Sequence, residues 1–467
     1  MANDRIKNLE GGSRRHFLRW MTTAGALLAL ERAKVLDVIA DAGGSALADE
    51  SCGASNRSVH LVAGLGGLAW FQLLWPQVAV AAAKDPGLAF HAPGSAIEAL
   101  DTDKPFYFGP EAPWQGLDKT KRVSAFMAGR NGGHILYPAS PSLNGGASMI
   151  AAAAAIQRAT PSLVPVIGMG DVMYGGAAGA PELVRVSDSK ELIGLFNTSA
   201  SKLILSKPED AALFEAYYKA FAGLQKASRL PTWTRSLRTG KAASNLLGTQ
   251  LAAMLSPTAV DLAKYGIPEE DATIPMKVRE LGEALITTAK AFKLGLTQCV
   301  IMPAMMDDPH EAFSNMPALQ RTVKAIGDVL SGFLVDLGGA SDPQCASKTF
   351  ADTTILTVHG DLPKDPLNPV GWPDSTPASS NWIYTMGNGY LKTGWFGGVG
   401  VDGSVRGFDP ATGEEVPWPA DAAGMEATSA PVGAAVLFAI AKGDMQRVTE
   451  FYAGPSIGGI IRENPLG

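Results

Sequence analysis

The chain has 467 residues, of which 46% are hydrophobic and 18% are charged, as expected for a well-buried globular protein of one large domain or two ordinary ones. Its formal net charge is −6 and its basic residues form no dense stripe. This argues against nucleic acid as the main partner, because phosphate binding needs clustered lysines and arginines. No other partner is indicated by the sequence.

The first fifty residues differ from the rest. The paired arginines of "SRRHFLRW" (13–20) precede a short apolar run at 21–30, as in a twin-arginine export signal. The run is about half of the ~20 residues that a spanning helix needs. Small residues in "ALADE" (46–50) suit a cleavage site. We therefore predict a signal region at 1–48 and a periplasmic or secreted location, with membrane contact only through an uncleaved signal. The alternative is an amphipathic N-terminal helix.

Three cysteines suit one disulfide and one buried thiol in an oxidising compartment. Cys299 lies in the apolar "QCVIM" and is expected in the core. Cys52 precedes one strand-like run and Cys345 precedes a later one. Parallel neighbouring strands would bring both to the same edge of a sheet, so we predict a Cys52–Cys345 disulfide.

Strand-like and helix-like segments alternate along the remaining chain. Apolar and β-branched runs predict strands at 58–64, 122–129, 162–170, 297–303 and 352–360, with short strands at 381–387 and 394–400. Apolar spacing, capping residues and alanine content predict helices at 146–159, 206–227, 278–295, 317–338 and 432–442. Pro165, inside the third strand, indicates an edge strand or a bulge.

This order predicts an α/β fold, a mainly parallel sheet with helices on both faces. We expect a single domain at 49–467 with a helical insertion at about 200–275. Ligands of such sheets bind beyond the carboxyl ends of the strands. The turns that follow 58–64, 297–303 and 352–360 are therefore the expected place of a site.

Acidic residues and histidines follow two of these predicted strands. Asp308 and His310 lie in "MMDDPH", and His359 and Asp361 lie in "TVHGD". These residue types bind divalent metals such as zinc, calcium or manganese, and separate strand ends can converge on one ion. The alternative is that they are polar turn residues that cap the following helices. The sequence thus predicts either a metal site or two polar turns.

The order of these motifs resembles an exported bacterial family, the domain of unknown function 1501, whose α/β fold is similar to alkaline phosphatases and sulfatases. The corresponding segments are "AGLGGL", "MMDDPH", "DTTILTVHGDLPKDP" and "NWIYTMGNGYLKTGWFGG", and the likeness covers most of 58–400. The resemblance implies an alkaline-phosphatase-like domain in which Asp308, His310, His359 and Asp361 hold a divalent metal.

The chain also departs from the family pattern. Gly66 stands where the family has an aspartate, and Asn381 stands where it has a histidine. A later acidic residue of the family aligns with Gly360 or, allowing one extra residue, with Asp361. One expected ligand is therefore missing, and another depends on the alignment.

Ser148 and His134 are the candidate catalytic residues. Enzymes of this type place a nucleophile at a helix N-terminus, and Ser148 precedes the alanine-rich predicted helix. His134 lies in a glycine-rich loop. The alternatives are a helix cap and an ordinary loop residue.

These observations predict an exported, alkaline-phosphatase-like protein with a degenerate metal site, which acts by binding or as a scaffold rather than by catalysis. The alternative is a metal-dependent hydrolase of phosphate or sulfate esters, so whether the chain is an enzyme stays open. A third hypothesis is a carbohydrate-binding surface formed by the aromatic residues of "NWIYTMGNGYLKTGWFGG", although we expect these residues to pack the last sheet instead.

Overall fold

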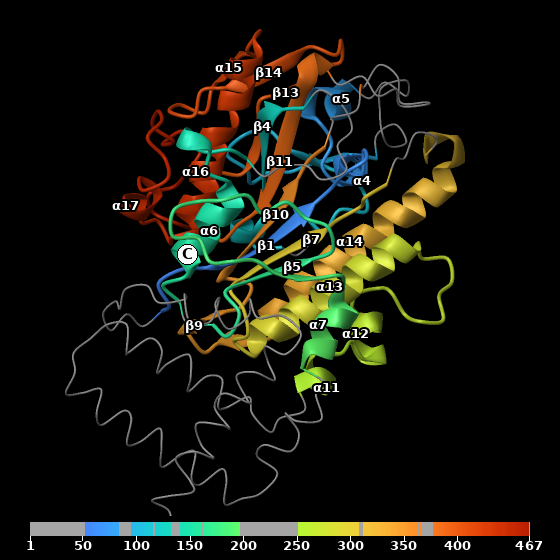
Figure 1. Ribbon diagram of the computed structural model, residues 1–467. Helices are drawn as coiled ribbons and strands as arrows, with labels where there is room; N and C mark the ends of the chain where they lie inside the picture. The colour runs from blue at the N-terminus through green and yellow to red at the C-terminus, as the bar shows by residue number, and fades with distance from the viewer. Residues whose placement is uncertain are drawn as a thin grey trace, which may run out of the picture.

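A computed structural model describes residues 52–83, 95–114, 117–131, 141–160, 162–196, 251–307, 312–361, 365 and 377–466. An eight-stranded sheet in the order β12-β4-β11-β10-β1-β7-β5-β6 runs through its centre (Figure 1). Its strands are β1 (Arg57–Val62), β4 (Val123–Arg130), β5 (Val166–Met169), β6 (Val184–Val186), β7 (Cys299–Pro303), β10 (Thr354–His359), β11 (Ser380–Met386) and β12 (Gly394–Phe396). β11 is antiparallel to both of its neighbours, and the other pairs in this sheet are parallel. The predicted α/β class and mainly parallel sheet are confirmed, whereas the reversed direction of β11 was not predicted.

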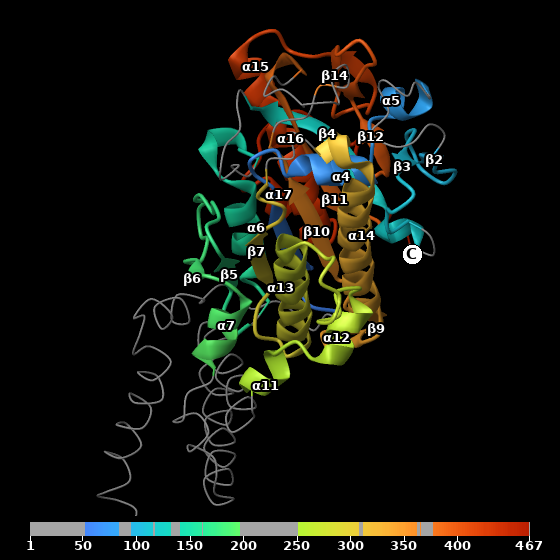
Figure 2. The same cartoon turned by 90° about the vertical axis from the view of Figure 1, so that its right-hand side faces the viewer.

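Helices cover both faces of this sheet (Figures 1 and 2). One face carries α6 (Met149–Gln157), α15 (Ala422–Ala427), α16 (Ser429–Ile440) and α17 (Met445–Val448). The other carries α4 (Leu68–Leu74), α7 (Ser189–Leu195), α11 (Leu251–Leu255), α12 (Ala259–Lys264), α13 (Met276–Lys293) and α14 (Met316–Gly338). We call these the α6/α16 face and the α13/α14 face.

Smaller elements lie around the main sheet. The short strands are β2 (Ile97–Glu98), β3 (Tyr107–Phe108), β8 (Ser341–Asp342), β9 (Cys345–Thr349), β13 (Gly398–Val399), β14 (Val405–Phe408) and β15 (Glu415–Pro417). The remaining helical segments are α5 (Val78–Ala83), η1 (Lys119–Lys121), η2 (Asn144–Gly146), η3 (Ala312–Asn315) and η4 (Pro377–Ser379).

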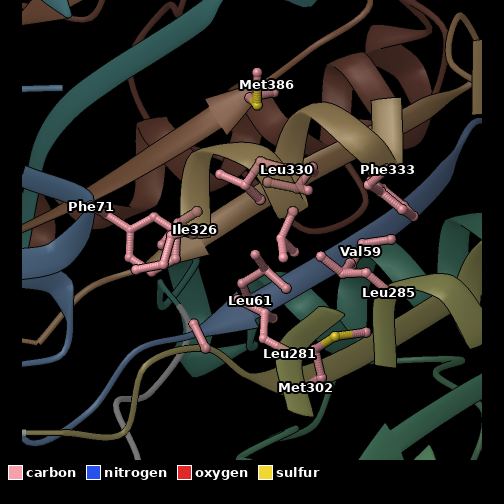
Figure 3. Packing of buried hydrophobic residues seen from close by; sticks show 14 of the residues in the cluster. Val59, Leu61, Phe71, Leu281, Leu285, Met302, Ile326, Leu330, Phe333 and Met386 are labelled. Carbon is pink, nitrogen blue, oxygen red and sulfur yellow. The ribbon is translucent and has the colours of Figure 1, made fainter. Parts of the chain in front are cut away.

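The two long helices form where their apolar spacing predicted them. Asn315 caps α14 by accepting a hydrogen bond from the backbone of Ala318, and the helix ends at Gly338. Figure 3 shows Leu330 and Phe333 of α14 packed toward Val59 of β1. All three are 0% exposed, so this face of the sheet is a continuous apolar core.

Pro165 was predicted to mark an edge strand or a bulge, and the edge assignment is wrong. β5 lies inside the sheet, between β7 and β6. The proline immediately precedes the first strand residue, Val166, so its missing N–H removes no ladder hydrogen bond.

Parts of the predicted helical segments fall outside the described residues. The helix at 206–227 lies there entirely, as does most of the insertion expected at about 200–275. The described part of that insertion contains α11 and α12. The signal region at 1–48 also lies outside.

The amino ends of β1 and β10 are held together by a disulfide and a buried ion pair. Cys52 is bonded to Cys345, as predicted, and Cys299 is a buried free thiol. The guanidinium of Arg57 donates two hydrogen bonds to the carboxylate of Asp342, at 2.6 and 3.2 Å. Burial alone would raise the pKa of Asp342, but the hydrogen bonds and charge of Arg57 outweigh it and hold that pKa below its usual value.

Among the described residues, one helical stretch, Ala422–Ile440, is long and apolar enough to cross a membrane. Of its apolar window, 67% is buried inside the protein, and every residue of α16 is buried against the sheet and α6. We therefore interpret it as a core helix.

Candidate functional site

The strands before the two predicted metal-binding turns end level with each other. β1 lies between β7 and β10, and its last residue, Val62, pairs with Pro303 on one side and His359 on the other. The turns are also close: a Cβ at Gly67, after β1, would lie 1.2 Å from the carbonyl oxygen of Met305, after β7. The carboxyl ends of these strands therefore form one rim, as the sequence predicted.

Only part of the predicted site belongs to the described residues. Asp308, His310 and His134 lie outside them. Asp307, the last residue described after β7, lies 3.8 Å from the ammonium group of Lys277. His359 and Asp361 are both described, and both are buried.

Asp361 joins three parts of the rim. It is fully buried, and its Oδ2 accepts a 2.5 Å hydrogen bond from the backbone N–H of Gly66, in the turn after β1. Its Oδ1 accepts a 2.9 Å hydrogen bond from the side-chain amide of Asn131, directly after β4. A buried carboxylate needs such donors. Gly66 thus contacts the second predicted acidic ligand through its backbone.

His359 is part of a buried chain of polar side chains on the α6/α16 face. We call Gln157, Ser58, His60, Thr357 and His359 the histidine relay. Thr357 Oγ1 lies 2.7 Å from His60 Nδ1 and 2.7 Å from His359 Nε2. His60 Nε2 lies 2.9 Å from Ser58 Oγ, which lies 3.0 Å from the amide nitrogen of Gln157. The relay therefore runs from the carboxyl rim down into the core.

Both relay histidines are uncharged at neutral pH. Burial lowers the pKa of His359 to about 3. Burial, and then the proximity of His359, lower the pKa of His60 well below its usual value. Burial also raises the pKa of the neighbouring Cys299 thiol to about 12, which keeps it protonated.

A cavity of about 180 Å³, which we call the rim cavity, lies next to His359. The polar residues that line it are Arg130, Ser142, His359, Asn381, Glu426 and Ser429. His359 pairs with Ile383, which packs in the α6/α16 core, so the imidazole lies on that face. Its Nδ1 is buried and has no hydrogen-bond partner within the described chain. The cavity is therefore lined by a residue that has one buried ring nitrogen without a partner among the described residues.

The mouth of the rim cavity carries one charge of each sign. Arg130 and Glu426 lie 3.7 Å apart, with 42% and 66% of their side chains exposed. An exposed pair of this kind contributes little to stability and rearranges at low cost. The side-chain amide of Asn381 donates a hydrogen bond to Gly360 O at 3.0 Å and accepts one from the backbone N–H of Trp382.

A larger cavity of about 400 Å³ lies at the other half of the rim, at the ends of β5 and β7. It is lined by the apolar Met169, Met302 and Pro303 and by charged residues of both signs, such as Lys277 and Glu280. No relay residue borders it. We place the candidate site at the smaller cavity because buried polar chemistry reaches only that one of the two.

Ser148 takes the position of a helix cap. Its Oγ donates a 2.7 Å hydrogen bond to Tyr174 O and accepts from the backbone N–H of Ala151 in the first turn of α6. It does not line the rim cavity. Most aromatic residues of the carbohydrate hypothesis pack inside: Tyr384, Trp395 and Phe396 are 0%, 4% and 1% exposed, whereas Tyr390 is partly buried.

The described residues do not form a metal centre by themselves. Within them, no group of three or more His, Cys, Asp or Glu residues is placed to hold an ion. His359 Nε2 is within hydrogen-bond distance of Thr357 Oγ1, and both oxygens of Asp361 accept hydrogen bonds. Metal ligation by these two would need partners from beyond the described chain.

Comparisons with protein-family models, with curated proteins and with solved structures found no match for this chain. The interpretation of the site therefore rests on its geometry.

Several residues of this site were not singled out from the sequence, among them His60, Arg130 and Glu426. His60 had a detectable signal, because polar residues alternate in "SVH" and in "TVH", which places Ser58, His60, Thr357 and His359 on one face of adjacent strands. Arg130 and Glu426 are separated by most of the chain, and nothing local in the sequence pairs them.

Proposed function

We propose that the protein is an exported, alkaline-phosphatase-like binding protein that holds a small polar ligand in the rim cavity. The observation that carries the proposal is the contrast within the predicted metal set: Asp361 is used to join strand ends, whereas His359 borders a cavity with one ring nitrogen unpartnered. The carboxylate of Asp361 joins Gly66 to Asn131, and this structural role explains its position without any catalytic function.

The cavity's chemistry indicates the kind of ligand. The imidazole of His359 is neutral because it is buried, and the charges of Arg130 and Glu426 oppose each other at the mouth. The cavity therefore offers no net charge of opposite sign that would stabilise a ligand of high net charge. A neutral or zwitterionic molecule with several hydrogen-bonding groups fits the lining, and the cavity's size limits it to a few heavy atoms.

The proposal is tested by thermal-shift measurements with a panel of small polyols, sugars, amino acids and carboxylates. A ligand that binds the folded state raises the melting temperature by mass action. We expect a stabilising compound for the unchanged protein and for Arg406→Ala, a control at an exposed arginine of β14 outside the cavity. The shift should shrink in Arg130→Ala. Equal shifts in both variants, or no stabilising compound, would count against the rim cavity as the site.

A metal-dependent hydrolase of phosphate or sulfate esters is the second candidate. It is favoured by the level ends of β7 and β10 on either side of β1, because the segment that carries Asp308 and His310 follows β7, and only β1 lies between the end of β7 and His359. Metal analysis of the purified protein distinguishes the two functions. A stoichiometric metal that is lost in Asp308→Asn, together with ester hydrolysis, would support the hydrolase; a metal-free protein that melts identically in chelator would support the binding protein.

A further inference from the structure

The histidine relay restricts where its protons can lie. Thr357 has one hydroxyl proton, and its Oγ1 lies 2.7 Å from both His60 Nδ1 and His359 Nε2. The hydroxyl can donate to one of these nitrogens and must accept an N–H from the other. The two nitrogens are themselves 3.4 Å apart, a distance that suits one proton between them rather than two or none. Two neutral imidazoles in this arrangement must be the same tautomer: both Nε2–H or both Nδ1–H.

The inner end of the relay accommodates one of these states. The amide nitrogen of Gln157 lies within hydrogen-bond distance of three acceptors: Asn56 O at 2.8 Å, Ser58 Oγ at 3.0 Å and Gln298 O at 3.2 Å. When its two protons go to the backbone carbonyls, which can only accept, Gln157 Oε1 accepts a hydrogen bond from Ser58 Oγ, 3.3 Å away. The Ser58 oxygen then accepts a hydrogen bond from the N–H at His60 Nε2, and the whole relay donates toward Gln157.

The outer end of the relay selects the same state. His359 Nδ1 is buried without a partner among the described residues. A buried N–H without an acceptor is rarer in folded proteins than a buried acceptor with an unused lone pair. A bare Nδ1, with the proton on Nε2, is therefore the less costly state before a ligand binds.

We propose that His60 and His359 both carry their proton on Nε2, and that His359 Nδ1 is a hydrogen-bond acceptor at the rim cavity that selects ligands with a hydroxyl or N–H donor. The inference rests on the proposed binding function for its ligand. Thr357, His60 and Ser58 are positioning residues, since they act only by setting the tautomer of His359. Gln157 is the anchor of the relay because two backbone carbonyls fix the direction of its amide.

The tautomers are measured directly in ligand-free protein labelled with ¹⁵N-histidine, by long-range ¹H–¹⁵N correlation spectra assigned with His60→Gln and His359→Gln. We expect Nε2–H for both rings. Thr357→Val should remove this order and give His359 a mixture of tautomers. The control is Thr385→Val: Thr385 pairs with Thr357 across the strands, and its buried hydroxyl has no partner in the described chain, so both tautomers should persist.

Opposite tautomers, Nδ1–H at both rings, or equal effects of the two valine variants would overturn the relay. Because these spectra contain no ligand, their outcome is independent of the search for a ligand by thermal shift.

The ligand class is tested with glycerol and its trimethyl ether at equal concentration, which share a carbon skeleton but differ in donors. Glycerol should move the ¹⁵N signal of His359 Nδ1 and the ether should not. The same shift with both compounds, or none with glycerol, would contradict a donor-selective site. Arg406→Ala should leave the glycerol response unchanged.

Discussion

The two faces of the central strands have different interiors. On the α13/α14 face, β1 and β10 contribute Val59, Leu61, Leu356 and Val358, all buried in an apolar cluster. On the α6/α16 face, the alternate positions of the same strands contribute the polar relay residues, which are equally buried. The strands are therefore stabilised by ordinary apolar packing on one side, while the other side carries hydrogen-bonding groups that each require a partner.

This difference indicates where the function lies. Apolar side chains of similar shape in place of the relay residues would fill the α6/α16 core without needing any of these hydrogen bonds. The relay ends at His359, which lines the rim cavity, and the Nδ1 atom of this residue has no partner in the part of the chain that the structure describes. Buried polar groups that lead to a cavity are more informative about function than the larger apolar core on the other face.

The largest expected effect on the free energy of unfolding comes from truncating a large apolar side chain on the α13/α14 face. Leu330→Ala, at a position that is 0% exposed in α14, should lower the free energy of unfolding by about 2–5 kcal/mol because it leaves a cavity. Denaturant unfolding measures the loss. Leu437→Ala, at an equally buried position of α16, is the matched truncation on the other face. It should lower the free energy of unfolding by a similar amount. A loss at Leu330 much smaller than at Leu437 would break the comparison, since it would mean that the α13/α14 face is not the main apolar core.

The next effect distinguishes the two threonines of the polar face. Thr357→Val should cost about 1–3 kcal/mol, because it leaves two imidazole nitrogens without their partner. Thr385→Val should be neutral or stabilising, because it removes a buried hydroxyl that bonds to nothing in the described chain. Chemical denaturation of the two variants in parallel gives the difference. Equal costs would show that the relay's hydrogen bonds add nothing to stability.

The polar face should also make stability depend on pH. Burial holds the pKa of His359 at about 3 and that of His60 well below its usual value, so between pH 6.5 and 3 the unfolded chain binds more protons than the folded one. The free energy of unfolding then has its full value above about pH 6.5. It falls with decreasing pH, by up to about 1.4 kcal/mol per pH unit for each histidine.

Unfolding measured from pH 7 to 4.5 checks this dependence above the range where most carboxylates titrate. His60→Gln should show a shallower slope because one titrating group is gone. A slope that is unchanged in this variant would mean that His60 is not neutral in the folded protein.

The smallest expected effect on stability is at the mouth of the rim cavity. Arg130→Ala should change the free energy of unfolding by no more than about 0.5 kcal/mol, because its pair with Glu426 is exposed. The same variant should weaken ligand binding. A large loss of stability would mean that Arg130 belongs to the structure rather than to the site.

The sequence was most informative in segments where a single hydrophobic period, that of a helix or of a buried strand, dominates. Apolar spacing predicted 317–338 and 278–295, and the helices run from Met316 to Gly338 and from Met276 to Lys293. Continuous apolar runs predicted the parallel strands, and strand direction predicted a common rim for the turns after β7 and β10. These features depend on residues that are close in sequence.

The remaining features depend on distant residues. The sequence allowed Asp361 to be a metal ligand or a turn residue, but its contacts with Gly66 and Asn131 join segments that no local pattern connects. The antiparallel direction of β11 likewise shows only in its pairing with β10 and β4, which are distant strands that no pattern in its own residues identifies. The cavity is formed by several separate segments, so its size and lining could not be predicted.

The disulfide between Cys52 and Cys345 bears on the order in which folding, export and covalent bond formation occur. The cytoplasm keeps thiols reduced, and the twin-arginine route predicted from residues 13–30 carries chains that are already folded. If the chain takes this route, its sheet is held together without the disulfide, by backbone pairing, packing and the Arg57–Asp342 pair, until it has crossed the membrane. In that case the covalent bond would form in the native arrangement, and it would protect a finished structure against later unfolding instead of guiding its assembly.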